Sequence, residues 1–330
     1  MGKGGAASAR AAGMSDVTYV YDGTPEGLLT AIFFAYVRRE EPDDILRPEF
    51  AQIRLGQEVF EVQTDIKFAL RVQRGISKAC GDAVSDAVLA TALSDDANAG
   101  TAIYRFVRYA LKKNAGGSCA GCKRKAACGG ACARGGGRGV LSDVAHPEVV
   151  AFHKLNRAVY NERHRIMQFL RFEHLQGDVW FARCNPKASV VPLVMDWFTG
   201  RFNTQNFMIY DEVHKIAGVY EGAFVPSAVI GANPCNLVSA GIDSDRAFDD
   251  LTRSTSAKRG SKTRTLSWYL VKTDFLQIPE HSAEEAAMQA AWKSFYDHVA
   301  VEARYNPELR RQFMPQRLWK NITEMKPDLS

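Results

Sequence analysis

The residues best suited to chemistry lie in segment 153–172, the longest uninterrupted helical pattern in the sequence. With successive side chains turned by about 100°, its polar residues fall along one flank. This polar stripe consists of His153, Arg157, Asn161, His164, Gln168 and Arg171. Side chains of these types hydrogen-bond phosphates and base edges in protein–DNA complexes, so the polar stripe indicates a surface that faces DNA. An ordinary solvated helix face is the alternative.

His164 is also a candidate general base, because an imidazole can take a proton from water near neutral pH. Glu162 or Asp211 would support it, and the activated water would attack a glycosidic or phosphodiester bond. Glu162 lies well round the helix from His164, however, and the sequence has neither a nucleophile elbow nor a two-carboxylate metal motif. A lesion-processing enzyme therefore remains one alternative.

Four cysteines form a candidate metal site in a segment rich in glycine, alanine and basic residues. They are spaced C-x2-C-x5-C-x3-C and are Cys119, Cys122, Cys128 and Cys132. Four thiolates in a short loop suit a tetrahedral Zn²⁺ ion, and the nearby glycines permit the necessary bends. An iron–sulfur cluster is a second possibility, although the spacing matches no ferredoxin pattern. An insertion without a metal is the third.

The C-terminal tail interleaves cations with aromatic residues. Its predicted DNA contacts are Arg310, Arg311, Arg317, Trp319 and Lys320. Cations attract a polyanion and aromatic rings stack on unpaired bases, so this composition favours nucleic-acid binding. The alternative is that Phe313, Met314 and Trp319 fix the tail to the core and leave the arginines at its rim.

Composition limits the class of protein. The chain has 330 residues and a formal charge of +5, which is too modest to indicate nucleic-acid binding by itself. Seven cysteines, an odd number, do not resemble a secreted disulfide framework and fit a reducing cytoplasm. No stretch approaches about twenty apolar residues, so we expect no membrane partner. Residues 1–14 are expected to be a disordered leader.

Local patterns predict the elements that position these residues. Residues 17–21 form a strand, Asp22-Gly23 a turn, and Thr24 and Pro25 the start of a helix. This strand-turn-helix opens an N-terminal α/β region over 15–113, rich in helices. The Gly/Cys-rich insertion, with the possible metal site, covers 114–146.

The C-terminal region, 147–330, is expected to contain an antiparallel sheet with packed helices, which makes the fold class α+β. Segments LRFEHL and VWFARC indicate either a hairpin or a helix end followed by a strand, and a polar loop covers 232–265. Ser282 and Glu285 form a predicted capping box for a final helix. The predicted core stripe of that helix is Met288, Trp292, Phe295 and Val299.

Four segments, taken in order, resemble a bacterial family of probable DNA metabolism or DNA repair proteins of unknown mechanism. They are VYDGTPEGLLTAIFFAY, HPEVVAFHKLNRAVYNERHRIMQFLRF, NFMIYDEVHKIAGVYEG and NPELRRQFMPQRLWKNITE. The cysteine insertion and the 232–265 loop depart from the pattern of that family. The resemblance implies a role in DNA repair beside a radical SAM protein, and a link to uracil-DNA glycosylase family domains. It assigns no catalytic residue.

Three hypotheses follow. In the first, the polar stripe and the tail bind DNA while a radical SAM partner does the chemistry. In the second, the chain is itself a hydrolase or a glycosylase-like enzyme with His164 as general base. In the third, it is a protein scaffold for the radical SAM partner.

Overall fold

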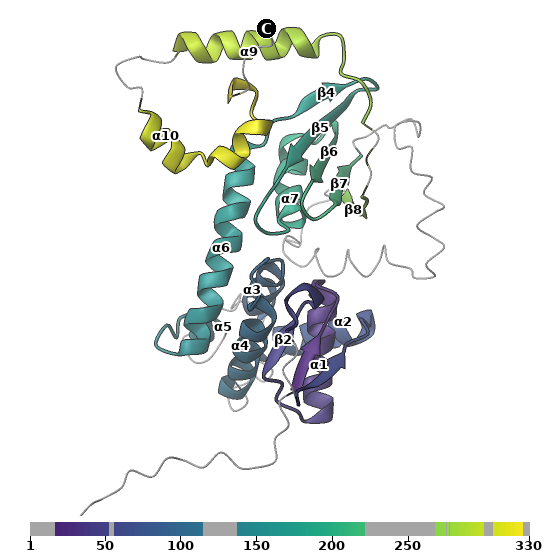
Figure 1. Cartoon of the computed structure of the whole chain (residues 1–330), viewed down its shortest axis with the longest axis vertical. Coiled ribbons are helices and arrows are strands. Elements are labelled where there is room, and N and C mark those ends of the chain that lie inside the picture. Colours follow the sequence, from purple (N-terminus) through teal and green to yellow (C-terminus); the bar gives the residue numbers. More distant parts are fainter. Residues whose placement is uncertain are drawn as a thin grey trace, which may run out of the picture. The chain divides into compact units, whose positions relative to one another are not determined.

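The computed structural model describes residues 17–52, 56–114, 137–221, 268–274, 276, 278–299 and 306–325. The expected α+β class is confirmed by the two sheets and the helices around them (Figure 1). The chain divides into two compact units. The N-terminal unit extends to Leu155 without residues 93–95, and the C-terminal unit combines Leu93–Asp95 with Asn156–Ser330. The predicted leader and the 232–265 loop lie outside the described residues.

The N-terminal unit contains a parallel sheet of three strands in the order β2-β1-β3. Its strands are β1 (Val17–Val20), β2 (Asp44–Leu46) and β3 (Glu58–Glu61). Parallel neighbours need a crossover, and α1 (Pro25–Arg38) supplies it between β1 and β2. The Thr24 hydroxyl accepts the Gly27 N–H at 2.9 Å, which confirms the predicted strand-turn-helix and its N-cap.

Helices form most of the rest of this unit. They are η1 (Pro48–Phe50), α2 (Ile66–Cys80), α3 (Asp82–Ala92), α4 (Ala99–Asn114) and α5 (Gly137–Leu141). The next helix, α6 (Pro147–Phe169), begins in this unit, where Phe152 stacks on Phe106 of α4 with ring centroids 3.9 Å apart. Both rings are buried, so the first turns of α6 belong to the N-terminal core.

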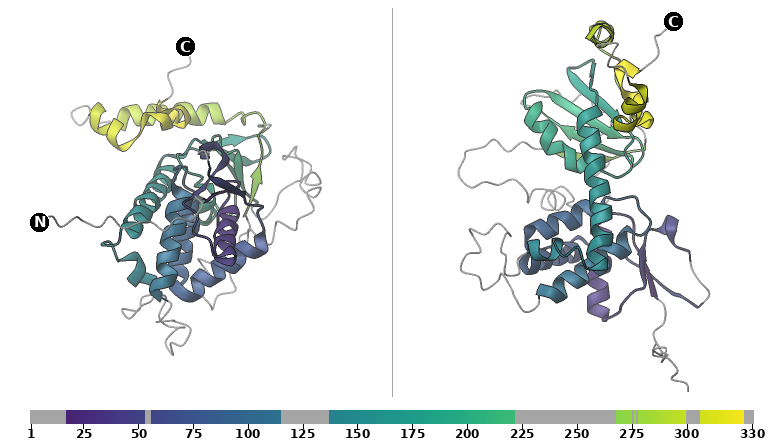
Figure 2. Two further views of the ribbon diagram at one scale, coloured as in Figure 1. Left: turned by 60° about the horizontal axis from the view of Figure 1, so that its bottom comes forward. Right: turned by 90° about the vertical axis from the view of Figure 1, so that its left-hand side faces the viewer.

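Helix α6 continues into the C-terminal unit from Asn156 onward as one continuous helix (Figure 2). This unit contains a five-stranded sheet in the order β4-β5-β6-β7-β8. Its strands are β4 (Glu173–Leu175), β5 (Val179–Cys184), β6 (Asn206–Asp211), β7 (Ile216–Tyr220) and β8 (Trp268–Lys272). The antiparallel β4–β5 pair confirms the hairpin, one of the two alternatives predicted for this segment.

The antiparallel prediction is wrong for one pair, since β5 and β6 are parallel. The reason is the crossover helix α7 (Val191–Arg201), which returns the chain to the starting end of the sheet. Helix α7 covers one face of the sheet, and a Cβ at Gly218 of β7 would lie 2.5 Å from Met195 Sδ. A glycine there lets helix and sheet approach closely. The other face buries Phe181 and Tyr210, with Leu276 packed against them.

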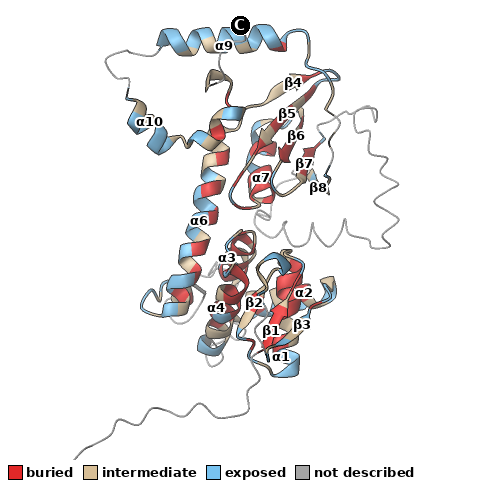
Figure 3. Cartoon of the chain, in the orientation of Figure 1, coloured by how far each residue is buried: buried red, intermediate tan, exposed pale blue. Residues whose placement is uncertain are grey.

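The C-terminal segment contains α9 (Glu285–Val299), α10 (Pro307–Phe313), η7 (Gln316–Asn321) and η8 (Thr323–Met325). The predicted core stripe of the final helix is wrong, because its four apolar side chains are exposed (Figure 3). The predicted capping box is absent too: the Glu285 carboxylate accepts the His174 N–H at 2.8 Å. Buried Leu318 and Ile322 fix the segment to the unit instead. No helix in the described ranges is both long and apolar enough to cross a membrane.

Candidate nucleic-acid interface

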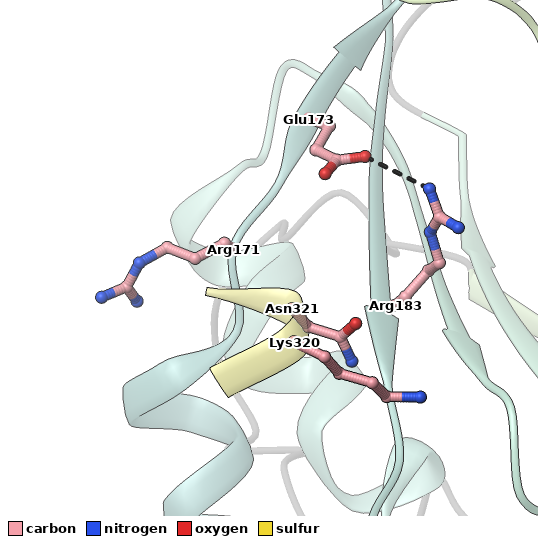
Figure 4. A pocket seen from close by; sticks show the side chains of 5 residues that line it. All are labelled: Arg171, Glu173, Arg183, Lys320 and Asn321. Carbon is pink, nitrogen blue, oxygen red and sulfur yellow. Dashed lines mark ion pairs between the residues drawn. The ribbon is translucent and has the colours of Figure 1, made fainter. Parts of the chain in front are cut away.

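A small polar pocket lies where four segments of the C-terminal unit meet (Figure 4). It has a volume of about 150 Å³. The lining residues come from the α6–β4 connection, β4, β5 and η7, and they are Arg171, Glu173, Arg183, Lys320 and Asn321. Three cations and a single carboxylate therefore surround the pocket. Arg171 belongs to the polar stripe and Lys320 to the basic tail, and both were predicted to contact DNA. The fold places both residues in the lining of this pocket.

Arg183 is the cation most available to a ligand. It lies on β5, and its guanidinium is 3.6 Å from a Glu173 carboxylate oxygen, with the side chain 40% exposed. Glu173 also lies 3.1 Å from the His281 imidazole. A long, partly solvated ion pair contributes little to stability, so Arg183 can exchange Glu173 for an anion at small cost.

Lys320 and Asn321 extend from η7 toward β5 (Figure 4). Lys320 pairs with Glu212 at 2.6 Å in an exposed position. The Asn321 side-chain NH2 is buried and has no hydrogen-bond partner among the described residues. An unsatisfied buried donor costs roughly 1–3 kcal/mol, and an oxyanion in the pocket would supply the missing acceptor.

Arg171 has mainly a structural role. Its guanidinium donates to Glu324 at 2.6 Å, and Figure 4 shows it directed away from the other four lining residues. The Trp292 indole N–H donates to the same carboxylate at 3.0 Å. Burial alone would raise the pKa of Glu324, but these hydrogen bonds outweigh it and lower the pKa. Arg171 thus holds η8 and α9 and contributes its stem to the pocket.

Arg317 is also engaged within the protein. Its guanidinium lies 2.6 Å from both carboxylate oxygens of Glu162, which is only 2% exposed. The Lys187 N–H donates to the same carboxylate, and Arg317 donates to the Asn185 carbonyl at 2.9 Å. This buried network joins α6, the segment after β5 and η7. We therefore correct the sequence prediction for Arg317, which fixes the tail to the core.

The part of the polar stripe that lies in the C-terminal unit is exposed to solvent as far as Gln168. Arg157, Asn161, His164 and Gln168 are exposed, and His164 and Gln168 are linked at 2.9 Å. His153 differs, because it lies in the N-terminal unit, partly buried, with its imidazole 2.5 Å from the Leu141 carbonyl. The stripe therefore supplies exposed polar groups from Arg157 onward, with Arg157 its most exposed cation.

Residues 131–324 match the family model described as a domain of unknown function, DUF4130. The chain belongs to the DUF4130 family. This agrees with the expected family of unknown mechanism, whereas the links to DNA repair, to a radical SAM protein and to uracil-DNA glycosylase stay predictions. A search of curated proteins finds no match. The DUF4130 match contains the whole pocket and the buried Glu162–Arg317 pair.

The proposed catalytic residues of the DUF4130 segment are not brought together. His164 is linked to Gln168, Glu162 is bound by Arg317, and Asp211 binds His214. Within the described ranges no hydrogen bond joins His164 to either carboxylate. Glu162 and Asp211, predicted to support a catalytic base, instead form ion pairs within the protein.

His214 had no role in the sequence predictions, and it lies between two carboxylates of the C-terminal unit. Its imidazole is 2.5 Å from Asp211 and 3.0 Å from Asp95. Burial alone would lower the pKa of His214, but the hydrogen bonds and charges of the two aspartates raise it to about 9. The D-x-x-H spacing in the β6–β7 turn was the only local signal. The imidazolium ties segment 93–95 to that turn.

The alternative in which the tail is fixed to the core holds for Met314, which packs against the core, but not for Phe313, which is 67% exposed. DNA binding by the tail stays a prediction. The Arg310 guanidinium lies 5.2 Å from the Trp319 ring centroid, and the Trp319 indole N–H donates to the Met314 carbonyl at 3.0 Å. Trp319 therefore supports the backbone, and its ring is partly occupied by a cation. Arg311 is exposed and can meet a phosphate.

The predicted metal ligands Cys119, Cys122, Cys128 and Cys132 lie outside the described residues. Three of the four also precede the DUF4130 match, which begins at residue 131. The two described cysteines, Cys80 and Cys184, are buried in the cores of the N-terminal and C-terminal units. No cluster of three or more metal-binding side chains occurs in the part of the chain that the structure describes. The zinc site, with the iron–sulfur cluster as its alternative, remains a prediction.

Proposed function

We propose that this protein binds DNA through backbone phosphates in DNA metabolism or repair, and that a partner performs the chemistry. One observation carries the proposal. The pocket joins Lys320 and the buried Asn321 amide of η7 to Arg183 of β5, while Arg171 lines the pocket with its guanidinium directed away. Cations and an unsatisfied N–H donor around one small space are what an oxyanion requires.

The size of the pocket favours one phosphate group. At about 150 Å³ the pocket accommodates only a small group. Pockets for drug-sized ligands are larger, at about 300–1,000 Å³. A phosphodiester of the DNA backbone fits this size better than a nucleoside does, which makes the pocket a positioning site and leaves base recognition elsewhere.

Exposed cations elsewhere on the C-terminal unit would extend the contact. Arg157 and Arg311 are exposed on α6 and α10 of the C-terminal unit, and Asn161 and Gln168 add polar groups. Phosphate contacts of this type give affinity without sequence preference. Phosphate contacts without sequence preference are sufficient for an accessory DNA-binding role.

The chemistry is assigned to a partner because the chain holds its candidate catalytic carboxylates in ion pairs. The buried network occupies Glu162, and His214 occupies Asp211. The resemblance implies a radical SAM protein as that partner, with a uracil-DNA glycosylase family protein as a further associate. Mixing purified radical SAM protein with this chain and DNA, and finding one complex of all three, would support the assignment.

Replacing Arg183 should weaken DNA binding. We expect Arg183→Gln to lose one charge-assisted phosphate contact, which corresponds to about 1.5 kcal/mol or roughly tenfold in Kd. The slope of log K against log salt should also fall by about 1. Fluorescence anisotropy with labelled single-stranded and duplex DNA, across a salt series, measures both quantities.

The matched control is Lys272→Gln, which removes an exposed cation on β8, at the opposite edge of the same sheet. It should leave the affinity and the salt slope nearly unchanged. If both variants weaken binding equally, the pocket is not the phosphate site. If the unmodified protein shows no salt-dependent binding, the DNA-binding function fails. The same samples report strand or base loss, and product abolished by His164→Ala would make the chain an enzyme.

A further inference from the structure

The outermost helix of the C-terminal unit presents an apolar stripe that the described fold leaves uncovered. The stripe consists of Met288, Trp292, Phe295 and Val299, which are 64%, 43%, 57% and 58% exposed. Figure 3 shows α9 as mostly exposed along its length. Large apolar side chains that gather on one helix face mark an interaction surface more often than a solvated one.

The spacing of the stripe indicates that its occupant is another helix. Successive members are four, three and four residues apart, which is the pattern of positions d, a, d and a in a heptad. Helix α9 is also held in place before any partner arrives. Glu285 accepts the His174 N–H, and the Trp292 indole N–H donates to Glu324 of η8. The stripe, called the seam below, is therefore already ordered, so binding a partner helix costs little additional conformational entropy.

The residues beside the stripe favour a second copy of this chain. In paired helices, charged residues at positions e and g set which helix is accepted and in which orientation, and like charges there repel an identical helix. Here those positions carry no acidic side chain, lysine or arginine: they are Gln289, Ala291, Tyr296 and His298. The charged residues Lys293 and Asp297 fall at the outer positions b and f. Nothing at the seam repels an identical helix, and nothing selects a different one.

An antiparallel arrangement matches the stripe to itself. When two copies are related by a twofold axis at the middle of the stripe, Trp292 faces Phe295 of the second copy and Met288 faces Val299. Aromatic side chains then meet aromatic ones, and aliphatic side chains meet aliphatic ones. The opposed helix dipoles add a small favourable term. We propose that this protein forms a twofold-symmetric homodimer through antiparallel pairing of α9.

Sedimentation velocity of the full-length protein, from about 1 to about 100 µM, tests the dimer. The unmodified protein should shift from monomer to dimer within this range. Phe295→Glu places a charge in the seam and should raise the dimer dissociation constant at least about tenfold. Leu309→Glu is the matched control, because Leu309 is 49% exposed on α10, outside the seam, and it should leave the dimer unchanged.

A complementation experiment tests the register. Met288→Glu and Val299→Lys should each weaken the dimer alone, because each places two unpaired charges in the seam. Mixing the two variants should restore dimers, since antiparallel pairing sets the new carboxylate opposite the new ammonium and keeps one native contact. In a parallel pair, mixing would only set each new charge opposite an apolar side chain, so no ion pair would form and the affinity of the unmodified dimer would not be restored. A wild-type monomer at about 100 µM, an unaffected Phe295→Glu dimer, or equal weakening by Leu309→Glu would each overturn the proposal.

Discussion

Replacing Arg317 with alanine should lower the free energy of unfolding of the C-terminal unit by about 3–5 kcal/mol. The substitution leaves the Glu162 carboxylate buried and without the cation that lies 2.6 Å from both of its oxygens. The lost guanidinium also leaves the Asn185 carbonyl without a donor. Urea denaturation followed by circular dichroism measures the loss, with a separate transition fitted for each unit.

A double variant identifies the cause. Glu162→Met combined with Arg317→Leu removes both charges together, so it should be more stable than Arg317→Ala alone. The free energy of unfolding of Arg317→Lys should lie between those of Arg317→Ala and the unmodified protein. The lysine keeps a positive charge, but its ammonium cannot reproduce the contacts of the guanidinium. An Arg317→Ala protein that unfolds like the unmodified one but no longer binds DNA would instead assign Arg317 to the DNA interface.

The second large effect is a loss of stability with increasing pH. His214 has a pKa of about 9 in the folded protein, compared with an ordinary value of 6.5. A raised pKa means that the folded state holds the proton more tightly than the unfolded state does. The stabilisation is therefore complete below about pH 6.5 and is lost as the pH rises through about 9. At about 1.4 kcal/mol per pKa unit, the loss amounts to roughly 3 kcal/mol.

His214→Gln is the variant that tests this effect. It removes the titrating group, so the free energy of unfolding should fall most at pH 6 and little near pH 10. The curves for the variant and the unmodified protein should therefore converge as the pH rises. Curves that stay parallel over the whole range would show that the charge on His214 does not stabilise the fold.

Local signals in the sequence predicted the start of α1 and the β4–β5 hairpin. Thr24 and Pro25 marked the start of α1 because caps are short-range features of the chain. The β4–β5 hairpin followed from two β-rich runs around Gly177. The α9 stripe shows the limit of such reasoning: helical spacing established an apolar face, but it could not establish what covers that face. Coverage depends on tertiary and quaternary contacts.

The candidate site was predicted in part. Periodicity located the exposed cation on α6, and composition located the basic tail. Arg183 and Asn321 carried no signal, because an arginine in a strand and an asparagine after a lysine occur in most proteins. Glu162 and Arg317, which pair with each other, are 155 residues apart in the chain. No local pattern could show that these two predicted functional residues neutralise each other.

The continuity of α6 has a consequence for anyone who cuts this protein into fragments. The DUF4130 match begins at residue 131, yet Val149 and Phe152 near the start of α6 are buried in the core of the preceding unit. A fragment that starts at the family boundary would separate Phe152 from its stacking partner Phe106 and expose the apolar side chains at the start of α6 to solvent. A fragment that starts at Asn156 would leave Phe152 out, but it would also lose Asp95, which pairs with His214. The family boundary is therefore not a folding boundary, and the C-terminal unit is best produced within the full chain.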